Sequence, residues 1–237
     1  MTELELDLIE ACAQAGCPIC RLTDASVSRY LDALMYELVN DIEMRDRLRR
    51  SLGFCNTHAH QLLKGVGLSL GIGILYRDLV NTTLKQLEQV KFSSTRSLTL
   101  RAAREALDRE QPSAATEPAV AALTPPEGCP ACAYQAEKET RLLTAMLDSL
   151  KDERMQTALQ ASAGLCLPHV RRAFQFARSE SAFEALVALT RDRLTKLRAE
   201  LDEFIRKNDY RFRDEGFGPE GDSWRRAIAH IVGREEF

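Results

Sequence analysis

The sequence has no long apolar run and no large excess of charge of one sign. No stretch of the 237 residues approaches the roughly 20 apolar residues of a membrane-spanning helix. The formal net charge is −3, whereas binding to nucleic-acid phosphates needs a concentrated excess of Lys and Arg. The sequence therefore favours neither membrane insertion nor nucleic-acid binding. Residues 1–10 are acidic and lack the basic and apolar regions of a signal peptide, so we expect a cytoplasmic protein.

Proline is missing from the long segments of the chain. The eight prolines all lie at a motif, in a linker or in the tail, and the segments between them are rich in Leu, Ala, Glu, Arg and Lys, which are good helix formers. Apolar residues recur there at helical spacing, as at Val27, Leu31, Leu34 and Leu38. No segment shows the alternation of β-branched residues that is typical of a strand. The sequence predicts an all-α fold.

Two short motifs occur twice, in the same order. C-P-x-C lies at 17–20 and again at 129–132, and G-[FL]-C-x-x-H lies at 53–58 and again at 164–169. The distance between the two motifs differs by a single residue between the copies, which indicates an internal duplication. We therefore predict a duplicated helical bundle.

The duplication suggests four parts of the chain. They are a first helical repeat with metal site 1 at 1–91, a linker at 92–127, a second helical repeat with metal site 2 at 128–207, and a C-terminal tail with a short helix at 208–237. In the tail, residues 209–213 and Trp224 form a polar and aromatic patch. We interpret this patch as a surface lid tied down by Tyr210 and Trp224, with closure over a ligand pocket as the alternative.

The paired motifs have the spacing of metal ligands. Two residues between ligands let both side chains of a tight turn reach one ion, and two such turns complete a tetrahedron of the kind that zinc prefers. We predict one zinc ion in each repeat. Site 1 takes its ligands from the first repeat and site 2 from the second: Cys17, Cys20, Cys55 and His58, and then Cys129, Cys132, Cys166 and His169.

Other interpretations of the same residues stay open. Three thiolates and an imidazole can also hold an iron–sulfur cluster, and C-P-x-C at a helix start also occurs in thiol–disulfide exchange. The cysteines can also simply pack in a core, and His60 is an alternative ligand to His58. Cys12 lies outside both sets, and we expect it to be a small buried residue of the first helix.

The motifs together resemble those of an uncharacterised bacterial family known only as a domain of unknown function. The resemblance rests on both C-P-x-C and both G-[FL]-C-x-x-H motifs, on D-Y-R-F at 209–212 and on S-W at 223–224, and it covers nearly the whole chain. It implies a bacterial cytosolic protein and supplies no catalytic residues.

The sequence thus favours a non-catalytic role. The leading hypothesis is a protein whose two structural zinc sites fasten helix starts, so that the assembled surface binds a protein partner. The alternative is a redox protein, with either iron–sulfur clusters or a zinc–thiolate switch that responds to oxidation. A hydrolase that uses one metal is the weakest hypothesis, because four protein ligands leave no coordination position for water.

Overall fold

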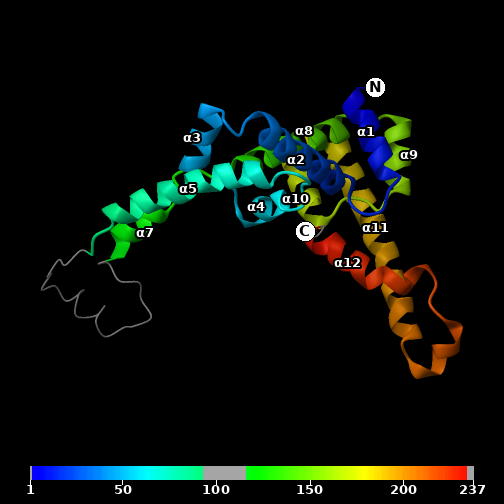
Figure 1. Ribbon diagram of the computed structural model, residues 1–237. Coiled ribbons are helices and arrows are strands. Elements are labelled where there is room, and N and C mark those ends of the chain that lie inside the picture. The colour runs from blue at the N-terminus through cyan, green and yellow to red at the C-terminus, as the bar shows by residue number, and fades with distance from the viewer. Residues whose placement is uncertain (1, 93–115, 234–237) are drawn as a thin grey trace, which may run out of the picture. The chain divides into compact units, whose positions relative to one another are not determined.

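The chain is helical throughout the part that the structure describes. The computed structural model describes residues 2–92 and 116–233 (Figure 1). These residues form eleven α-helices and two 3₁₀ helices and contain no strand: α1 Glu3–Cys12, α2 Pro18–Glu37, α3 Ile42–Arg50, α4 Asn56–Leu62, α5 Ser69–Gln89, α7 Glu117–Leu123, α8 Pro130–Asp148, α9 Glu153–Ala161, α10 Leu167–Phe176, α11 Glu180–Lys207, η2 Tyr210–Glu215, η3 Pro219–Asp222 and α12 Ser223–Val232. The predicted all-α fold is confirmed. None of the described helices has the length and apolar character needed to cross a membrane.

The helices follow the same order after each C-P-x-C motif. A long helix, a nine-residue helix, the helix of the second motif and another long helix occur as α2–α5 and again as α8–α11. Asp41 and Asp152 cap the nine-residue helices by accepting hydrogen bonds from the backbone N–H groups of Met44 and Met155, at 2.7 and 3.3 Å. Helix α7 forms inside the predicted linker 92–127, of which residues 93–115 lie outside the described part.

The compact units of the structure are not the two sequence repeats. The first unit comprises residues 1–29 and 134–237, and the second comprises residues 30–133. Helices α2 and α8 begin in one unit and end in the other. Each unit therefore combines a piece of one repeat with a piece of the other, and this exchange decides which cysteines can meet.

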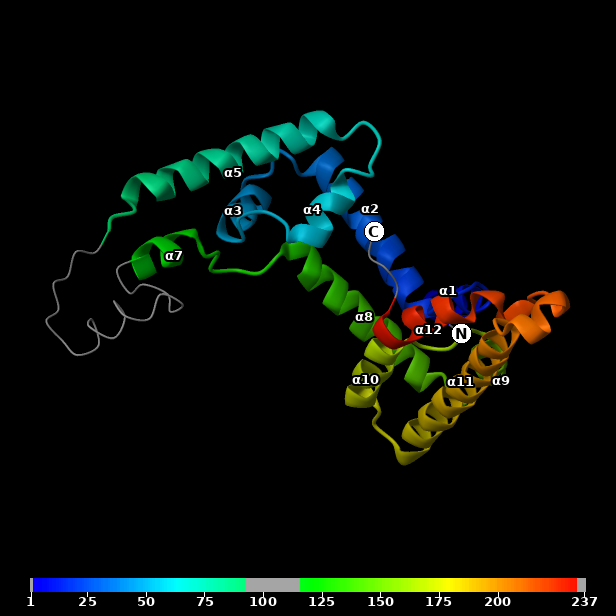
Figure 2. The same ribbon diagram turned by 90° about the horizontal axis from the view of Figure 1, so that it is seen from below.

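A leucine-rich core holds the first unit together. Leu143 and Met146 of α8 are fully buried and pack with Leu8 of α1, Met155 of α9 and Val170 of α10. In Figure 2 these helices surround α11 and α12 in the lower right of the view. Since each fully buried leucine contributes about 2 kcal/mol through the hydrophobic effect, this core is a main source of the unit's stability.

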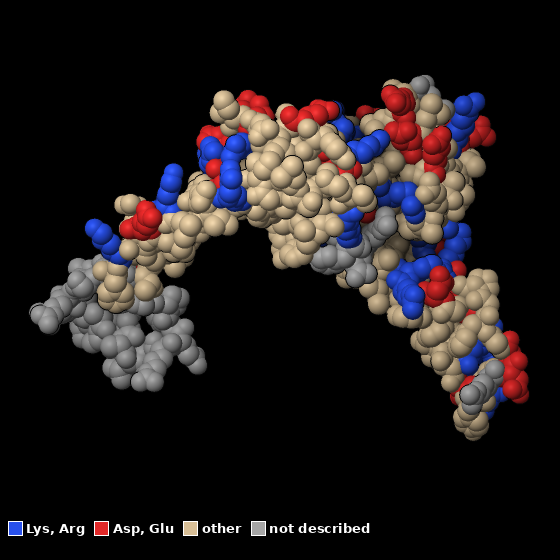
Figure 3. Space-filling model, viewed as in Figure 1, with Lys and Arg blue, Asp and Glu red and all other residues tan. Residues whose placement is uncertain are grey.

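Ion pairs fasten α3 to α5 in the second unit. The Asp78 carboxylate accepts hydrogen bonds from Arg49 at 2.9 and 3.2 Å and forms an ion pair with Arg45 at 3.4 Å. Arg50 pairs with Asp46 and with Glu127. Blue and red side chains accordingly lie side by side over α3 in Figure 3. These ion pairs neutralise Arg45, Arg49 and Arg50 of α3. This basic face of α3 is therefore better explained as a neutralised helix surface than as a phosphate-binding site.

The tail is fastened to α11 by ion pairs and by an aromatic contact, in which the ring of Phe217 stacks on the ring of Phe204 with 5.3 Å between their centroids. Tyr210 is 85% exposed, so its predicted role in tying down the tail is wrong, whereas Trp224 is 42% exposed. Lys207 at the end of α11 instead donates a 2.8 Å hydrogen bond to the buried carboxylate of Glu220. The same carboxylate accepts the backbone N–H of Gly218 at 2.8 Å. The charged end of α11 is thus what holds η3.

Replacement of Glu220 by Gln should lower the unfolding temperature at pH 7. The Lys207 ammonium and the backbone N–H groups lower the pKa of Glu220 from 4.5 to about 2, so the folded protein prefers the ionised carboxylate. This stabilisation is present above pH 4.5 and is lost as the pH falls towards 2. Thermal melts of the wild type and Glu220→Gln should therefore converge over that range. A difference that stays constant would contradict the ion pair.

Candidate metal centres

The eight predicted ligands gather in two groups of four. The first quartet consists of Cys17, Cys20, Cys166 and His169, and the second quartet consists of Cys55, His58, Cys129 and Cys132. Within each quartet the four candidate ligand atoms all lie within 4.8 Å of one another. Each quartet also lies entirely within one compact unit. Both groups therefore have the size of a site for a single ion.

Nδ1 of His169 lies at the centre of the contacts in the first quartet. It lies 3.5 Å from Sγ of Cys17, 3.4 Å from Sγ of Cys20 and 3.1 Å from Sγ of Cys166. The sulfurs of Cys20 and Cys166 are 3.7 Å apart.

The second quartet repeats these contacts. Nδ1 of His58 lies 3.2 Å from Sγ of Cys55, 3.6 Å from Sγ of Cys129 and 3.4 Å from Sγ of Cys132. The sulfurs of Cys55 and Cys132 are 3.5 Å apart.

These spacings fit four ligands around one tetrahedral ion. Zinc–sulfur bonds of about 2.3 Å and zinc–nitrogen bonds of about 2.0 Å imply tetrahedral edges of about 3.5 to 3.8 Å. The separations given above, from 3.1 to 3.7 Å, are close to those edges, and the remaining ligand pairs of each quartet lie within 4.8 Å. They are also far longer than the roughly 2.05 Å of a disulfide bond, and all seven cysteines are free. The donor set and its geometry therefore suit a metal ion.

Helix starts place all eight ligands. Pro18 and Pro130 are the first residues of α2 and α8, where proline is favoured because it lacks an N–H and has a helical φ angle. Cys55 and Cys166 are the N-caps of α4 and α10, and their side chains make no capping hydrogen bond. Because the backbone N–H groups at a helix start carry partial positive charge, they stabilise nearby thiolates. The sulfurs are thus held near helix starts with no competing capping role.

A glycine with positive φ sets each G-[FL]-C turn. Gly53 has φ +92° and Gly164 has φ +79°, a conformation that other residues adopt only with strain. A Cβ atom on Gly53 would lie 2.9 Å from Cδ1 of Leu79, and one on Gly164 would lie 3.0 Å from Cγ of Arg193. Glycine is therefore needed at both positions for conformation and for space.

The predicted grouping of the ligands is wrong. The motif order predicts that Cys17 and Cys20 group with Cys55 and His58, but the structure pairs each C-P-x-C motif with the C-x-x-H motif of the other repeat. The physical reason is that α2 and α8 begin in different units from those in which they end. Motif spacing identifies which residues can be ligands, but it carries no information on an exchange between repeats.

The first quartet has a buried polar support. Nε2 of His169 lies 3.7 Å from Glu139, which also binds Arg172 at 2.8 Å and Gln135 at 3.1 Å. Burial raises the pKa of Glu139, but His169 and Arg172 outweigh it, and the net shift is downward. A carboxylate that lies near the second nitrogen of a ligating histidine favours one orientation of the ring through its negative charge.

The sequence analysis missed this support, although the repeats contain a signal for it. In the first repeat, the position that corresponds to Glu139 is Val27 and the position that corresponds to Arg172 is Gln61. Glu139 and Arg172 are charged, whereas the matching positions of the first repeat are not. This difference between otherwise matching motifs indicates a contact that only one of the two sites makes.

The second quartet is more open to solvent. Cys132 is exposed, and Cys55 and Cys129 are half-buried, whereas Cys20 and Cys166 of the first quartet are buried. Partial burial, the hydrogen bond with Cys55 and the neighbouring thiolate charges raise the pKa of Cys132 to about 12. A bound cation would relieve this repulsion, because it compensates the charge of several thiolates at once.

His60 and Cys12 lie outside both quartets. Nδ1 of His60 lies 2.8 Å from the carbonyl oxygen of Asn56, and His60 belongs to neither quartet. His58 is therefore the histidine that the geometry selects. Cys12 is 3% exposed within the core of the first unit, and burial raises its pKa to about 11. The prediction of a small buried residue is confirmed.

The fold and the sites together define an all-helical protein with two candidate Cys₃His metal centres. The chain belongs to DUF6062, a family of unknown function whose sequence profile matches residues 4–237. It is also 24% identical to a protein of Caldicellulosiruptor sp. (strain Rt8B.4) named "Uncharacterized 23.9 kDa protein in xynA 3'region", over 96% of this chain and 100% of that protein. No solved structure matches the chain. The expected resemblance to a family of unknown function is thereby confirmed.

Pairs of alanine substitutions distinguish the observed grouping from the one predicted along the sequence. Cys20→Ala with Cys166→Ala removes two ligands from one quartet, so one metal ion per chain should remain. Cys20→Ala with Cys55→Ala damages both quartets, so metal content should fall towards zero. Metal analysis after gel filtration measures both, and Cys12→Ala is the matched control that should keep two ions. If Cys20→Ala with Cys55→Ala instead kept one ion and Cys20→Ala with Cys166→Ala lost both, ligation within each repeat would be supported.

Proposed function

We propose that this protein is a non-catalytic zinc protein whose two Cys₃His sites fasten distant helix starts to each other. The observation that carries the proposal is the gathering of six cysteines and two histidines into two quartets of tetrahedral size. Zinc is favoured by the mixed thiolate and imidazole donors and by the closed set of four ligands. An iron–sulfur cluster fits less well, because its ligands bind different iron atoms and lie farther apart than ligands of one ion.

A structural role follows from what each ion would connect. Cys20 and Cys166 are separated by 146 positions in the chain, and Cys55 and Cys132 by 77. A link between such distant positions removes much conformational entropy from the unfolded chain. Structural zinc can also contribute roughly 10 kcal/mol or more of apparent folding free energy. Four protein ligands at each ion leave no position for a substrate or a water molecule, which argues against catalysis at the metal.

The cellular compartment and the partner of this protein stay predictions. Thiolate sites of this kind suit a reducing compartment such as the cytoplasm, and a protein partner on the assembled surface is still expected. Cross-linking of the zinc-loaded chain in its native cells, followed by mass spectrometry, tests for that partner. Recovery of cross-links within the chain alone would count against it.

Purified protein should contain two zinc ions per chain and should unfold when the zinc is removed. We expect a strong chelator to abolish the cooperative thermal transition and to reduce the helical circular dichroism signal, because each ion contributes folding energy. Elemental analysis of protein purified without oxygen, together with a visible spectrum, measures the metal. Iron with inorganic sulfide, or a chelated protein that melts like the loaded one, would overturn the proposal.

The exposure of the second quartet favours a zinc–thiolate switch as a second candidate function. Cys132 is open to solvent and its sulfur lies 3.5 Å from that of Cys55. Hydrogen peroxide can take two electrons from this pair of thiolates. One sulfur–sulfur bond forms, the oxygen–oxygen bond breaks to give two waters after protonation, and the zinc ion is released. The first quartet would keep its metal longer because Cys20, Cys166 and His169 are buried and only Cys17 is half-buried.

Limited peroxide treatment should release one zinc ion from the loaded protein before the other. We expect mass spectrometry of the product to find a Cys55–Cys132 disulfide with Cys20 and Cys166 still reduced. Cys132→Ser should lose this disulfide. Zinc release from both quartets at equal rates would rule out the switch, and so would full retention of zinc at a peroxide concentration that oxidises free cysteine.

A further inference from the structure

Two neighbouring hollows in the first unit share three residues. One is a cleft of about 270 Å³ and the other is a small apolar cavity of about 20 Å³. Gly164, Arg193 and His230 line both of them. Because these three residues line both hollows, we treat the two as one site with a wide end and a narrow apolar end.

Most charged groups of the cleft are already paired with each other. Arg226 binds Asp222 at 2.7 Å and also binds Glu200. Lys196 pairs with Asp192 at 2.8 Å. The rest of the cleft wall is mainly small or apolar, and it includes Ala15, Ala163, Leu197 and Ala229. These pairs leave little unsatisfied charge at the outer part of the cleft.

Arg193 and His230 are the exceptions. Nε of Arg193 is buried and has no hydrogen-bond partner within the described part of the chain. A carboxylate oxygen of Asp192 lies 3.8 Å from it, which is beyond hydrogen-bond distance. Nε2 of His230 is likewise buried without a described partner. A buried polar nitrogen without a partner is costly, so these two side chains together point to a ligand that accepts hydrogen bonds.

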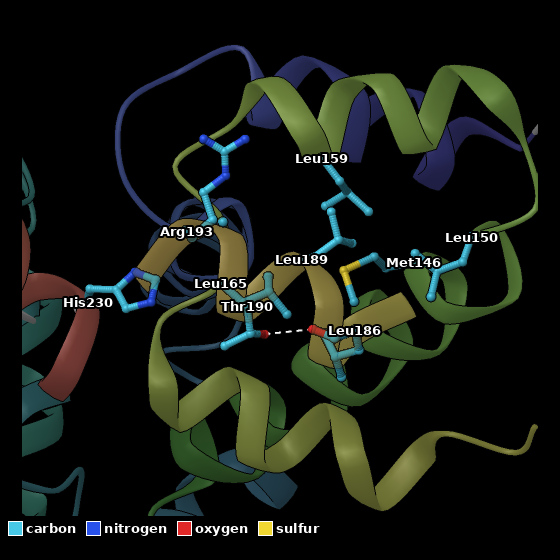
Figure 4. A pocket seen from close by; sticks show the side chains of 10 residues that line it. Met146, Leu150, Leu159, Leu165, Leu186, Leu189, Thr190, Arg193 and His230 are labelled. Atoms are coloured by element: carbon cyan, nitrogen blue, oxygen red, sulfur yellow. Dashed lines mark hydrogen bonds between the residues drawn. The ribbon is translucent and has the colours of Figure 1, made fainter. Parts of the chain in front are cut away.

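The narrow end is apolar. Its walls are Met146, Leu150, Leu159, Leu165, Leu186 and Leu189. Figure 4 shows Arg193 and His230 on one side of this pocket and Met146, Leu150 and Leu159 on the other. The Thr190 hydroxyl donates to the carbonyl oxygen of Leu186 at 2.7 Å, so it already has an acceptor. A space of about 20 Å³ has room for roughly one water-sized group, such as one methyl of a short branched chain whose remaining carbons would lie in the cleft.

We propose that this site binds a small organic carboxylate with a short branched apolar group. The carboxylate would lie against Arg193 and His230, and the apolar group would reach past Gly164 towards the leucines. A planar guanidinium matches a carboxylate. A doubly charged phosphate is disfavoured because Glu200 and Asp222 line the same cleft.

The site also lies beside the first metal quartet. Cys17 and Cys166 line the same cleft as Arg193 and His230. Three thiolates and one divalent ion would leave the quartet with net negative charge, so the acid group of a ligand belongs at the Arg193 end. The proposal goes beyond the structural role of zinc and does not require a reaction at the metal.

Isovalerate is a suitable probe because it combines one carboxylate with a branched methyl end. Isothermal titration calorimetry of the metal-loaded full chain should detect its binding. Isopentylamine, with the same carbon skeleton and opposite charge, should not bind. Arg193→Gln should weaken isovalerate binding by about tenfold or more, since it removes a charged hydrogen-bond donor. Arg191→Gln is the matched control, because Arg191 lies on the same helix and is exposed, and it should bind like the wild type.

Three results would overturn the carboxylate site. They are no heat from isovalerate, equal binding by Arg193→Gln and the wild type, or tighter binding of inorganic phosphate. Ala229→Phe, which fills the cleft, provides a second variant if Arg193→Gln fails to fold, and it should also abolish binding. Zinc content is measured in each sample. Loss of carboxylate binding with two zinc ions retained would leave the proposed structural role intact, whereas binding by a protein that lacks zinc would contradict that role alone.

Discussion

The meeting of two helix starts at each quartet is the constraint on which the structure depends. A C-P-x-C turn offers two sulfurs, and a C-x-x-H turn offers one sulfur and one imidazole, and neither pair alone can surround an ion. The structure supplies the missing half from the other repeat. Partial burial and the neighbouring thiolates raise the pKa of Cys132, and a bound cation would compensate the thiolate charge. A cation in each quartet would thus both compensate the thiolate charge and hold together two distant parts of the chain.

The two centres have the same donors but different surroundings. Glu139 and Arg172 support the histidine of the first quartet, and the corresponding positions of the first repeat are Val27 and Gln61. The second quartet includes the exposed Cys132. The repeated motifs thus supply two similar sets of ligands, and the side chains around them bury one set more deeply than the other. A difference of this kind suits two separate tasks for the two sites.

Much of this arrangement could be predicted from the sequence, because it depends on local patterns. Prolines at 18 and 130, the caps Asp41 and Asp152, and the periodic leucines specify helices and their starts through interactions over a few residues. The ligand types follow from motif spacing. The grouping of the ligands could not be predicted, since it depends on where α2 and α8 pass between units. The fastening of the tail by Lys207 and Glu220 depends on a three-dimensional contact that no periodicity records.

The exchange of ligands between repeats has a consequence for biosynthesis. A ribosome makes Cys17, Cys20, Cys55 and His58 long before it reaches Cys129, and in the folded protein these four residues belong to different quartets. During translation they are therefore the nearest available partners for one another, and an early ion can join them in a non-native group. Completion of the second repeat must then displace that group. The order of synthesis and the final grouping of the ligands thus oppose each other.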